Sequence, residues 1–364
     1  MIPDFRDEAD GVRRYCNGDL AELRAFQARM HGAHSLLLDP ARADWLFSRN
    51  PLRPDDGPAI WICRRGDRVV GTEAGIPFDL IVHGETCRGS WAVELMVDPE
   101  WRGRGVGPAL SEAHRQSCRV SCGLSVSDAA HRSLLRRRST DMGDVPMFLR
   151  LVDPRRVLRW EGAPRPVRYV AFPLIAPTLW LLDRMGRIGD KRTDLHPVDR
   201  FDQRADILWQ KVSTLYPVIS RRDAAWLRWR FDESPSRDEY RRYYVLHRER
   251  LIGYLVLRQT LWSGYMALAI VDYLAAPRDL ARLLACSVDV ARRLGAAAVL
   301  CNTLNVQAEA ALRSSGFFRR RNQSVRFLTY TSDEPLGRVV HNRSKWFITS
   351  ADSDLDSAAS LTHS

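Results

Sequence analysis

Residues 93–110 read VELMVDPEWRGRGVGPAL and predict a strand, a turn, a glycine loop and a helix, in that order. The strand ends in Val-Asp-Pro-Glu, and Gly103, Gly105 and Gly107 follow at alternate positions. Glycine lets a backbone approach a ligand with its N–H groups pointing inward, and the positive end of the following helix dipole favours an anion. The stretch therefore predicts a site for a phosphate-bearing ligand.

Two common phosphate-binding loops do not fit this spacing. The dinucleotide fingerprint requires a glycine where Pro108 stands, and the P-loop requires Gly-Lys-Ser/Thr, which the sequence does not have here. Pro108 suits the first position of a helix, because its missing N–H is not needed there. We therefore expect the helix to begin at Pro108.

The remaining pattern, Arg-x-x-Gly-x-Gly at residues 102–107, resembles the coenzyme A loop of the GNAT acyltransferases. The resemblance is specific over residues 89–119 and extends over 29–154. It implies that loop amides hold the coenzyme pyrophosphate, that the preceding strand splays from its neighbour, and that the pantetheine arm pairs with the exposed edge. The co-substrate that it implies is acetyl-CoA or another acyl-CoA. The binding residues that it implies are Leu95, Met96, Val97, Arg102, Gly103, Arg104, Gly105, Val106, Gly107 and Pro108.

Landmarks of the first half of the chain recur in the second half in the same order. They are a tryptophan motif, a hairpin glycine, a proline after a strand and a polar residue that begins a helix. The separations of 184, 182, 178 and 177 residues drift slowly, which indicates one ancestral unit with short deletions. The pairs are Trp45 with Trp229, Gly71 with Gly253, Pro99 with Pro277, and Asp128 with Asn305.

The order of helices and strands predicts an α/β fold of two units, each a central mixed β-sheet flanked by helices, and the resemblance implies that both units are GNAT-like. We expect an acyl-CoA-binding unit at residues 1–157, a linker at 158–205, a degenerate unit at 206–332 and a C-terminal tail at 333–364. In the second unit Ala-Pro-Arg-Asp at 276–279 replaces the glycine loop, so no pyrophosphate should bind there in the same way. The chain thus resembles tandem GNAT proteins with one catalytic and one degenerate unit.

Acyl transfer to an amine requires a base, because amines are mostly protonated at neutral pH. Glu94 is the first candidate, since it is the one charged residue in 91–97 and alternates with Ala92 and Met96. A structural carboxylate paired with an arginine is the alternative reading. Glu73, in the neighbouring strand, is the second candidate, with an ordinary solvent-facing position as its alternative. Backbone N–H groups around Met96 would polarise the thioester carbonyl.

Other polar residues have open roles. His114 and His131 lie on predicted helices, where surface or capping roles compete with substrate binding. Many GNAT enzymes use a tyrosine of the late helix as general acid, but Leu135 and Leu312 stand at the aligned positions. Water could protonate the thiolate instead, as could a tyrosine of the second unit: Tyr243, Tyr244, Tyr254 or Tyr265. A basic helix face could meet the coenzyme 3′-phosphate or simply be solvated: Arg132, Arg136, Arg137 and Arg138.

The charge balance is basic and unevenly distributed. The 364 residues contain 55 Lys+Arg and 44 Asp+Glu, and residues 101–170 hold 14 arginines against 6 acidic residues. That segment should attract an anion, and an acidic acyl carrier protein is one candidate. Nucleic acid is not expected as a partner, because no helix-turn-helix or aromatic-basic pattern accompanies the charge.

The remaining signals concern compartment and metals. Seven cysteines form no CxxC pair or Cys/His cluster, which favours neither a disulfide framework nor a metal site. The acidic start, residues 1–10, does not resemble a signal peptide, so we expect a cytoplasmic protein. Residues 170–182 contain two prolines and are too short to span a bilayer, which makes membrane contact unlikely; a strap between units is the expectation.

The resemblance thus implies transfer of an acetyl or other acyl group from acyl-CoA to the amine of a small molecule, such as an amino sugar or a natural-product intermediate. Two alternatives stay open: an acyl carrier protein as donor, and a non-catalytic CoA-binding regulatory or scaffold protein. Asp352, Asp354 and Asp356 alternate as in a calcium loop but lack its glycine and distal glutamate, so we expect a solvated tail without a metal.

Overall fold

Helices and strands alternate along both halves of the chain. The computed structural model describes residues 11–31, 38–153 and 193–356. The elements up to residue 153, the first half, are β1 (Val12–Arg14), η1 (Asn17–Asp19), α1 (Leu20–His31), α2 (Pro40–Ala43), η3 (Asp44–Ser48), β2 (Ile60–Arg65), β3 (Arg68–Val82), β4 (Glu85–Val97), η4 (Pro99–Trp101), α3 (Val106–Gln116), β5 (Val120–Leu124), α4 (Asp128–Arg136) and β6 (Thr140–Leu151).

The second half, from residue 193, follows a similar order. Its elements are β7 (Thr193–Pro197), α7 (Gln203–Val212), η5 (Ser213–Leu215), β8 (Val218–Ser220), α8 (Ala224–Leu227), η6 (Arg228–Asp232), η7 (Arg237–Glu239), β9 (Tyr240–His247), β10 (Arg250–Trp262), β11 (Tyr265–Ala275), η8 (Pro277–Asp279), α9 (Leu280–Arg293), β12 (Ala298–Leu304), α10 (Val306–Ser314), β13 (Phe318–Tyr330), α11 (Glu334–Val340), η9 (Arg343–Lys345) and β14 (Trp346–Thr349).

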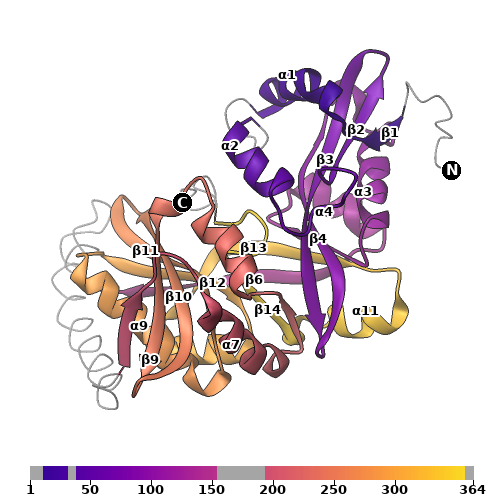
Figure 1. The fold of residues 1–364 in the computed structure, drawn as a ribbon. Helices are drawn as coiled ribbons and strands as arrows, with labels where there is room; N and C mark the ends of the chain where they lie inside the picture. The colour runs from indigo at the N-terminus through magenta and orange to yellow at the C-terminus, as the bar shows by residue number, and fades with distance from the viewer. Residues whose placement is uncertain (1–10, 32–37, 154–192, 357–364) are drawn as a thin grey trace.

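One mixed sheet runs through both halves. Its strands follow the order β1-β2-β3-β4-β5-β13-β6-β12-β11-β10-β9-β7, and β8 and β14 are attached beside this path. Figure 1 shows the first half in indigo to magenta, the second half mainly in orange, and helices against the strands of each. The predicted α/β class with a mixed sheet is confirmed.

Strands β6 and β13 join the two halves. β6 belongs to the first half and pairs with β12 of the second, whereas β13 belongs to the second half and lies between β5 and β6. Each half therefore completes its part of the sheet with a strand from the other. Each half also contains one parallel strand pair next to these two strands: β4 with β5 in the first half, and β11 with β12 in the second.

Residues 45 and 229, which the sequence pairs as repeat landmarks, touch each other. The indole Nε1 of Trp45 donates to the carbonyl of Trp229 at 2.6 Å, and Nε1 of Trp229 donates to the carbonyl of Trp45 at 3.0 Å. The two rings stack with centroids 5.6 Å apart. Such reciprocal contacts are typical of a two-fold symmetric interface, here between the two halves of one chain.

The first half places helices on both faces of its part of the sheet. In the first half Leu23 and Phe26 of α1 join the main core, while Val106 and Leu110 of α3 pack with Trp61 in a separate cluster. Trp61 alternates with core residues along β2, so α1 and α3 cover opposite faces. Figure 1 shows these two helices on either side of β2 and β3.

Short strands beside the main path connect its two halves again. β14 pairs with β12 and β8, and β8 also pairs with β3. Strands β3-β4-β5-β13-β6-β12-β14-β8 thus close a ring. Aromatic contacts continue across its core: Phe78 with Trp91 (4.9 Å between centroids), Trp91 with Phe327 (6.2 Å), and Phe327 with Trp346 (5.1 Å).

The expected linker is described only in part. Residues 154–192, which include the expected strap at 170–182, lie outside the described residues. From residue 193 the chain forms β7, which pairs with β9, and α7 begins at Gln203 within the expected linker. No helix among the described residues has the length and apolar character needed to span a bilayer. The division at residues 157, 205 and 332 stays a prediction.

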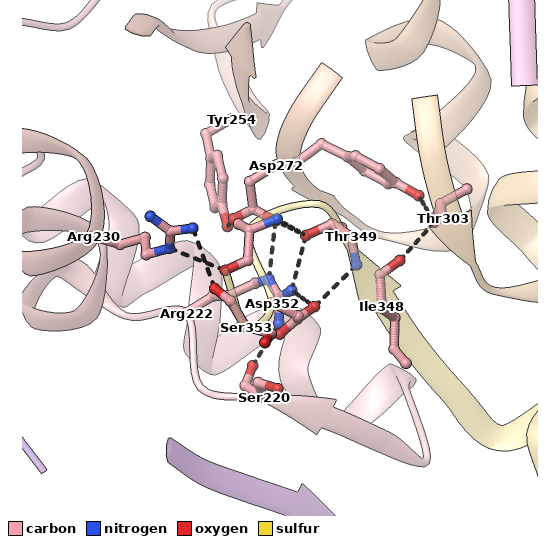
Figure 2. A network of polar contacts seen from close by, with 12 residues as sticks. Ser220, Arg222, Arg230, Tyr254, Asp272, Thr303, Ile348, Thr349, Asp352 and Ser353 are labelled. Atoms are coloured by element: carbon pink, nitrogen blue, oxygen red, sulfur yellow. Dashed lines mark hydrogen bonds and ion pairs between the residues drawn. The ribbon is translucent and has the colours of Figure 1, made fainter. Parts of the chain in front are cut away.

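Residues 352–356 do not form a solvated tail, and residues 357–364 lie outside the described residues. Asp352 and Asp356 are each 2% exposed, and Asp354 is half-buried, so the expectation for these three carboxylates is wrong. Arg222 binds Asp352 at 2.6 Å, and Arg230 binds Asp356. Buried guanidinium groups require anionic partners, and the C-terminal carboxylates supply them. Figure 2 shows Arg222, Arg230 and Asp352 within this network.

Candidate active site

The turn after β4 is anchored by the carboxylate of Asp98. This carboxylate accepts the amide N–H of Glu100 at 3.2 Å and pairs with Arg29 at 3.3 Å and Arg68 at 3.0 Å. The Asp98 amide donates to the carbonyl of Val70 at 2.9 Å, which ties the turn to β3. Asp98 therefore fixes the predicted Val-Asp-Pro-Glu turn through both its side chain and its main-chain amide.

The glycine loop leads directly into α3. Gly103 has φ +75° and Gly105 has φ +85°, a left-handed conformation that glycine adopts at little cost. The amides of Gly103, Gly105, Val106 and Gly107 have no hydrogen-bond acceptor among the described residues, whereas the amide of Arg104 donates to the carbonyl of Trp101 at 3.4 Å and that of Ala109 to Gly105 at 3.0 Å. These N–H groups and the helix dipole can together bind an anion.

The helix begins two residues before its expected start. Val106 is its first residue, Gly105 is its N-cap, and Pro108 is its third residue. Proline still fits there, because the first-turn amides have no partner within a helix. Pro108 thus has no N–H for a ligand, and the available donors lie at residues 103–107.

Basic side chains surround the loop. Arg102 and Arg104 are exposed, and the Nε of Arg102 donates to the carbonyl of Val97 at 3.1 Å. The guanidinium carbons of Arg104 and Arg65 lie 5.1 and 5.3 Å from the ring centre of Trp101. These contacts hold positive charge beside the open amides.

Strands β4 and β5 separate next to the loop. They pair only at residues 89–91 and 120–122, and from residue 92 to 97 β4 pairs with β3 alone among the described strands. We call this opening the first split. Its β4 edge includes the main chain of Leu95 (half-buried), Met96 (buried) and Val97 (half-buried), the predicted positions for the pantetheine arm.

Glu94 lies in a β-bulge on this edge. Val93 pairs with Ala74 and Met96 pairs with Thr72, so one residue of β3 faces two residues of β4. Glu94 is half-buried, and its φ of +57° is rare for a residue with a side chain. Backbone strain of this kind is concentrated at functional sites.

The bulge shows that one expectation about Glu94, its regular alternation with Ala92 and Met96, is wrong. Strict alternation would put Ala92, Glu94 and Met96 on one face of the sheet. Instead Ala92 lines a small cavity on the α3 face, whereas Met96 joins the main core on the opposite face. The extra residue in β4 shifts the side-chain alternation by one position.

Glu73 faces α3 directly opposite the bulge. It is 1% exposed, accepts a hydrogen bond from the Ser111 hydroxyl at 2.9 Å and lies 3.7 Å from Nδ1 of His114. The solvent-facing alternative for Glu73 is therefore wrong. The cavity beside it is about 20 Å³ in size, and its lining includes Arg115 and Tyr330.

Burial sets the charge states of this pair. It raises the pKa of Glu73 to about 7 and lowers the pKa of His114 to about 3, so the two groups are held without forming an ion pair near neutral pH. His114 is 1% exposed and contacts the hydroxyls of Ser90 at 2.8 Å and Ser121 at 3.3 Å. The expected surface or capping role of His114 is thus wrong.

Replacing Glu73 with glutamine is expected to remove a pH dependence of stability. With a pKa of about 7 in the fold, against 4.5 ordinarily, Glu73 holds a proton that the unfolded chain releases. Its contribution is fully present below the unfolded pKa and is lost as the pH rises through about 7. A difference of one pKa unit corresponds to about 1.4 kcal/mol. As the pH rises from about 4.5 to above 7, the free energy of unfolding of wild type should therefore fall by about 3 kcal/mol relative to that of Glu73→Gln.

Chemical unfolding from about pH 5 to 8 measures this difference. His114 stays neutral in the fold over this range and is common to both proteins, so its unfolded-state titration cancels in the comparison. Glu100→Gln, at an exposed position, should retain the wild-type slope. Parallel profiles for wild type and Glu73→Gln would mean that Glu73 is already ionised in the folded protein.

Several predicted polar residues lie away from the first split or have other partners. His131 binds Asp141 at 2.9 Å. Tyr254 is fully buried and donates to Asp272, and Tyr244 contacts Asp202. Arg132, Arg136 and Arg138 are exposed on or beside α4, and Arg137 is half-buried with its carbonyl bound to Arg115 at 2.9 Å.

Sequence reasoning missed Arg115 and Tyr330. The guanidinium carbon of Arg115 lies 4.0 Å from the ring centre of Tyr330, and its Nη2 donates to the Ser139 hydroxyl at 2.6 Å. Tyr330 reaches this place through β13, which comes from the second half. The buried position of His114 could have been inferred from its place one helical turn after Leu110.

The second half lacks the open loop. Where the first half has glycines, η8 ends at Asp279, which is 5% exposed and whose carboxylate lies 3.4–3.6 Å from three guanidinium groups. They belong to Arg250, Arg278 and Arg282. A carboxylate therefore stands at the start of α9, a place where the first half presents free amides.

Comparison with known proteins finds one family model that matches part of the first half. Residues 24–128 match the family model of the acetyltransferase (GNAT) domain, a segment that contains β4, the glycine loop and α3. Among curated proteins, none matches the chain by sequence. The loop, the splayed strand and the bulge all lie within the matched segment.

Solved structures share the fold over most of the chain. A GCN5-related N-acetyltransferase from Anabaena variabilis has a TM-score of 0.59 at 13% identity, covering 89% of this chain and 73% of that one. One from Kribbella flavida has 0.55 at 17% identity, with 92% and 74% covered. Saccharomyces cerevisiae N-myristoyltransferase with bound myristoyl-CoA has 0.53 at 10% identity, with 89% and 83% covered. At these identities the likeness is one of fold.

Proposed function

We propose that the protein is an acyltransferase that moves an acetyl or other acyl group from acyl-CoA to the amine of a small molecule. The observation that supports this most directly is the loop at residues 103–107, whose open amides begin α3 beside the first split. The family match over residues 24–128 supports the same class of reaction.

The donor would bind in two parts. The loop amides and the start of α3 take the coenzyme diphosphate, and the exposed Arg102 and Arg104 add positive charge. The pantetheine arm carries amide groups, and the β4 edge at residues 92–97 offers main-chain partners to it. A thioester placed at that edge has N–H groups near Met96 to polarise its carbonyl.

Glu94 would act as the base. The amine nitrogen attacks the thioester carbonyl and forms a C–N bond as the C–S bond breaks, so the nitrogen must lose a proton and the thiolate must gain one. Glu94 lies in the strained bulge of the β4 edge, two residues from Met96. Glu73 would support it from the buried side of the bulge, as a positioning residue.

The second half would be a degenerate copy that shapes the acceptor side. Asp279, with its three arginines, would exclude a diphosphate from the start of α9, because two anions would compete for one site. The proposed division is a first unit at residues 1–157, a linker at 158–205, a second unit at 206–332 and a terminal segment at 333–364. Location in the cytoplasm stays a prediction.

One second candidate is a coenzyme-binding regulatory protein without catalysis. It is favoured by Leu135 and Leu312, since leucine cannot protonate a thiolate where relatives use tyrosine. An acyl carrier protein as donor also stays a prediction, and the exposed arginines at 132, 136 and 138 would be its docking residues.

A mass-spectrometric screen tests the proposed function. The protein is mixed with acetyl-CoA and a panel of amino sugars, polyamines and aromatic amines, and acylated products and free thiol are measured together. Acyl transfer to an amine, absent in Gly105→Val, supports the proposal. Coenzyme binding without thiol release for any amine favours the regulatory protein. Transfer only from an acyl carrier protein identifies that donor, and no binding of any thioester ends the proposal.

A further inference from the structure

The second half contains a split that corresponds to the first. β11 pairs with β12 from Ala267 to Ile270 and then separates from it, as β4 separates from β5. A β-bulge lies at a matching place, since Val256 pairs with Asp272 and Leu257 with Ile270, which leaves Val271 without a partner on β10. We call this opening the second split.

The C-terminal segment lies within the second split. On one side Thr349 and Ile348 pair with Thr303 and Leu304 of β12. On the other side the amide of Ala351 donates to the carbonyl of Val271 in β11 at 3.0 Å. The segment therefore contacts both edges of the opening through its main chain, as a pantetheine arm would contact an open strand edge.

The carboxylate of the second bulge is held by this segment. Asp272 follows Val271 in β11, as Glu94 follows Val93 in β4, and it is fully buried. Its carboxylate accepts hydrogen bonds from the Thr349 hydroxyl at 2.7 Å and the Tyr254 hydroxyl at 2.6 Å. Figure 2 shows Asp272 and Thr349 facing each other with Tyr254 beside them.

An arginine links both ends of this arrangement. Nε of Arg222 binds Asp272 at 3.2 Å, and its Nη2 binds Asp352 at 2.6 Å and the Thr349 hydroxyl at 3.2 Å. Arg222 and Asp272 are fully buried and Asp352 is 2% exposed. Displacing the segment would leave Arg222 and Asp272 without Asp352 and Thr349 in a buried place, which is strongly unfavourable.

We propose that residues 346–352 act as a built-in occupant of the second split, so that the chain holds one acyl-CoA and holds it in the first half. The part of this proposal that concerns the coenzyme rests on the proposed function. The segment substitutes for a ligand by giving β11 and β12 main-chain partners, by donating the Thr349 hydroxyl to Asp272 and by giving Arg222 a second carboxylate partner. The second half is thereby fixed as a rigid support for the first.

Hydrogen exchange read by mass spectrometry tests the occupancy directly in the full chain. Peptides that cover residues 346–352 and β11 should exchange slowly without any ligand, because their amides are buried and paired. Saturating acetyl-CoA should slow exchange at residues 95–107 and leave 346–352 unchanged. Fast exchange of 346–352 without ligand, or faster exchange there with acetyl-CoA, would overturn the proposal.

Calorimetry with acetyl-CoA supplies the second measurement. The expected stoichiometry is one coenzyme per chain, and Gly105→Val should leave no remaining site. Two sites per chain, or one that persists in Gly105→Val, would show that the second split is open to the coenzyme. If the wild-type chain binds no coenzyme at all, the proposed function fails, and the exchange at residues 346–352 still decides the occupancy.

A matched pair of variants isolates the buried ion pair. Asp352→Asn weakens the contact with Arg222 and should speed exchange of residues 346–352 by about tenfold or more, since hydrogen bonds between charged groups are the stronger ones. Asp354→Asn changes a half-buried carboxylate two residues after the segment, bonded to the neighbouring Ser353 hydroxyl at 3.0 Å, and residues 346–352 should exchange in this variant as in wild type. Equal exchange in both variants would count against the arrangement. If Asp352→Asn does not fold, the hydrogen exchange and the coenzyme stoichiometry of the wild-type protein decide whether the second split is occupied.

Discussion

Gly105→Val is expected to abolish acyl-CoA binding. Gly105 adopts φ +85° at the N-cap of α3, a conformation that a β-branched residue tolerates poorly. The loop must change shape to accept valine, which would displace the unpaired amides at residues 103, 105, 106 and 107 on which the proposed site depends. Hydrogen bonds to a charged group contribute about 1.5–3 kcal/mol each, so losing two should weaken binding by about 100-fold or more. Isothermal titration with acetyl-CoA measures the loss.

A second glycine provides the matched control. Gly264 has φ +78° in the turn between β10 and β11, and a Cβ there would meet no atom within 4 Å. Gly264→Val therefore imposes a similar backbone strain in the second half, away from the loop. It should lower the melting temperature but retain coenzyme binding. Wild-type affinity in Gly105→Val would remove the loop from the proposed site.

Glu94→Gln is expected to slow acyl transfer while coenzyme binding stays close to that of wild type. Glutamine keeps the size of the side chain but cannot accept the proton of the amine, and removal of a general base typically slows the reaction by about 10²–10⁴-fold. Steady-state rates should show a lower kcat, with a dissociation constant for acetyl-CoA that changes little. Titration calorimetry and thiol release, measured on the same preparation, separate the two quantities.

Glu100→Gln serves as the control for this substitution. Glu100 is exposed in η4, six residues along the chain, and its backbone amide is bound by Asp98. Its variant should transfer at the wild-type rate. An undiminished kcat in Glu94→Gln would exclude Glu94 as the base and direct attention to Glu73, across the bulge.

The local part of the candidate site could be predicted from the sequence. Glycine spacing, the Val-Asp-Pro-Glu turn and the helix start are properties of consecutive residues, and Gly103 and Gly105 adopt the conformations that their residue type favours. The separation of β4 from β5 followed from the family resemblance. The bulge at Glu94 could not be predicted, because it depends on how β4 registers against β3.

The long-range part was not predictable from sequence patterns. Asp352 and Asp356 alternate like a solvated segment, and their partners Arg222 and Arg230 lie more than a hundred residues away in the chain. Tyr330 reaches the cavity of Glu73 only because β13 crosses into the first half. Non-local pairing of this kind leaves no periodic signal in either partner.

Because β6 and β13 each pair with strands of the other half, neither half of the protein contains a complete sheet by itself. A gene fragment that ends at residue 157 would encode the whole glycine loop but not β13, so β5 and β6 would each present an unsatisfied backbone edge. Such edges recruit other chains and lead to aggregation. Moving the first half into another scaffold therefore requires a surrogate strand in the place of β13, or the whole polypeptide.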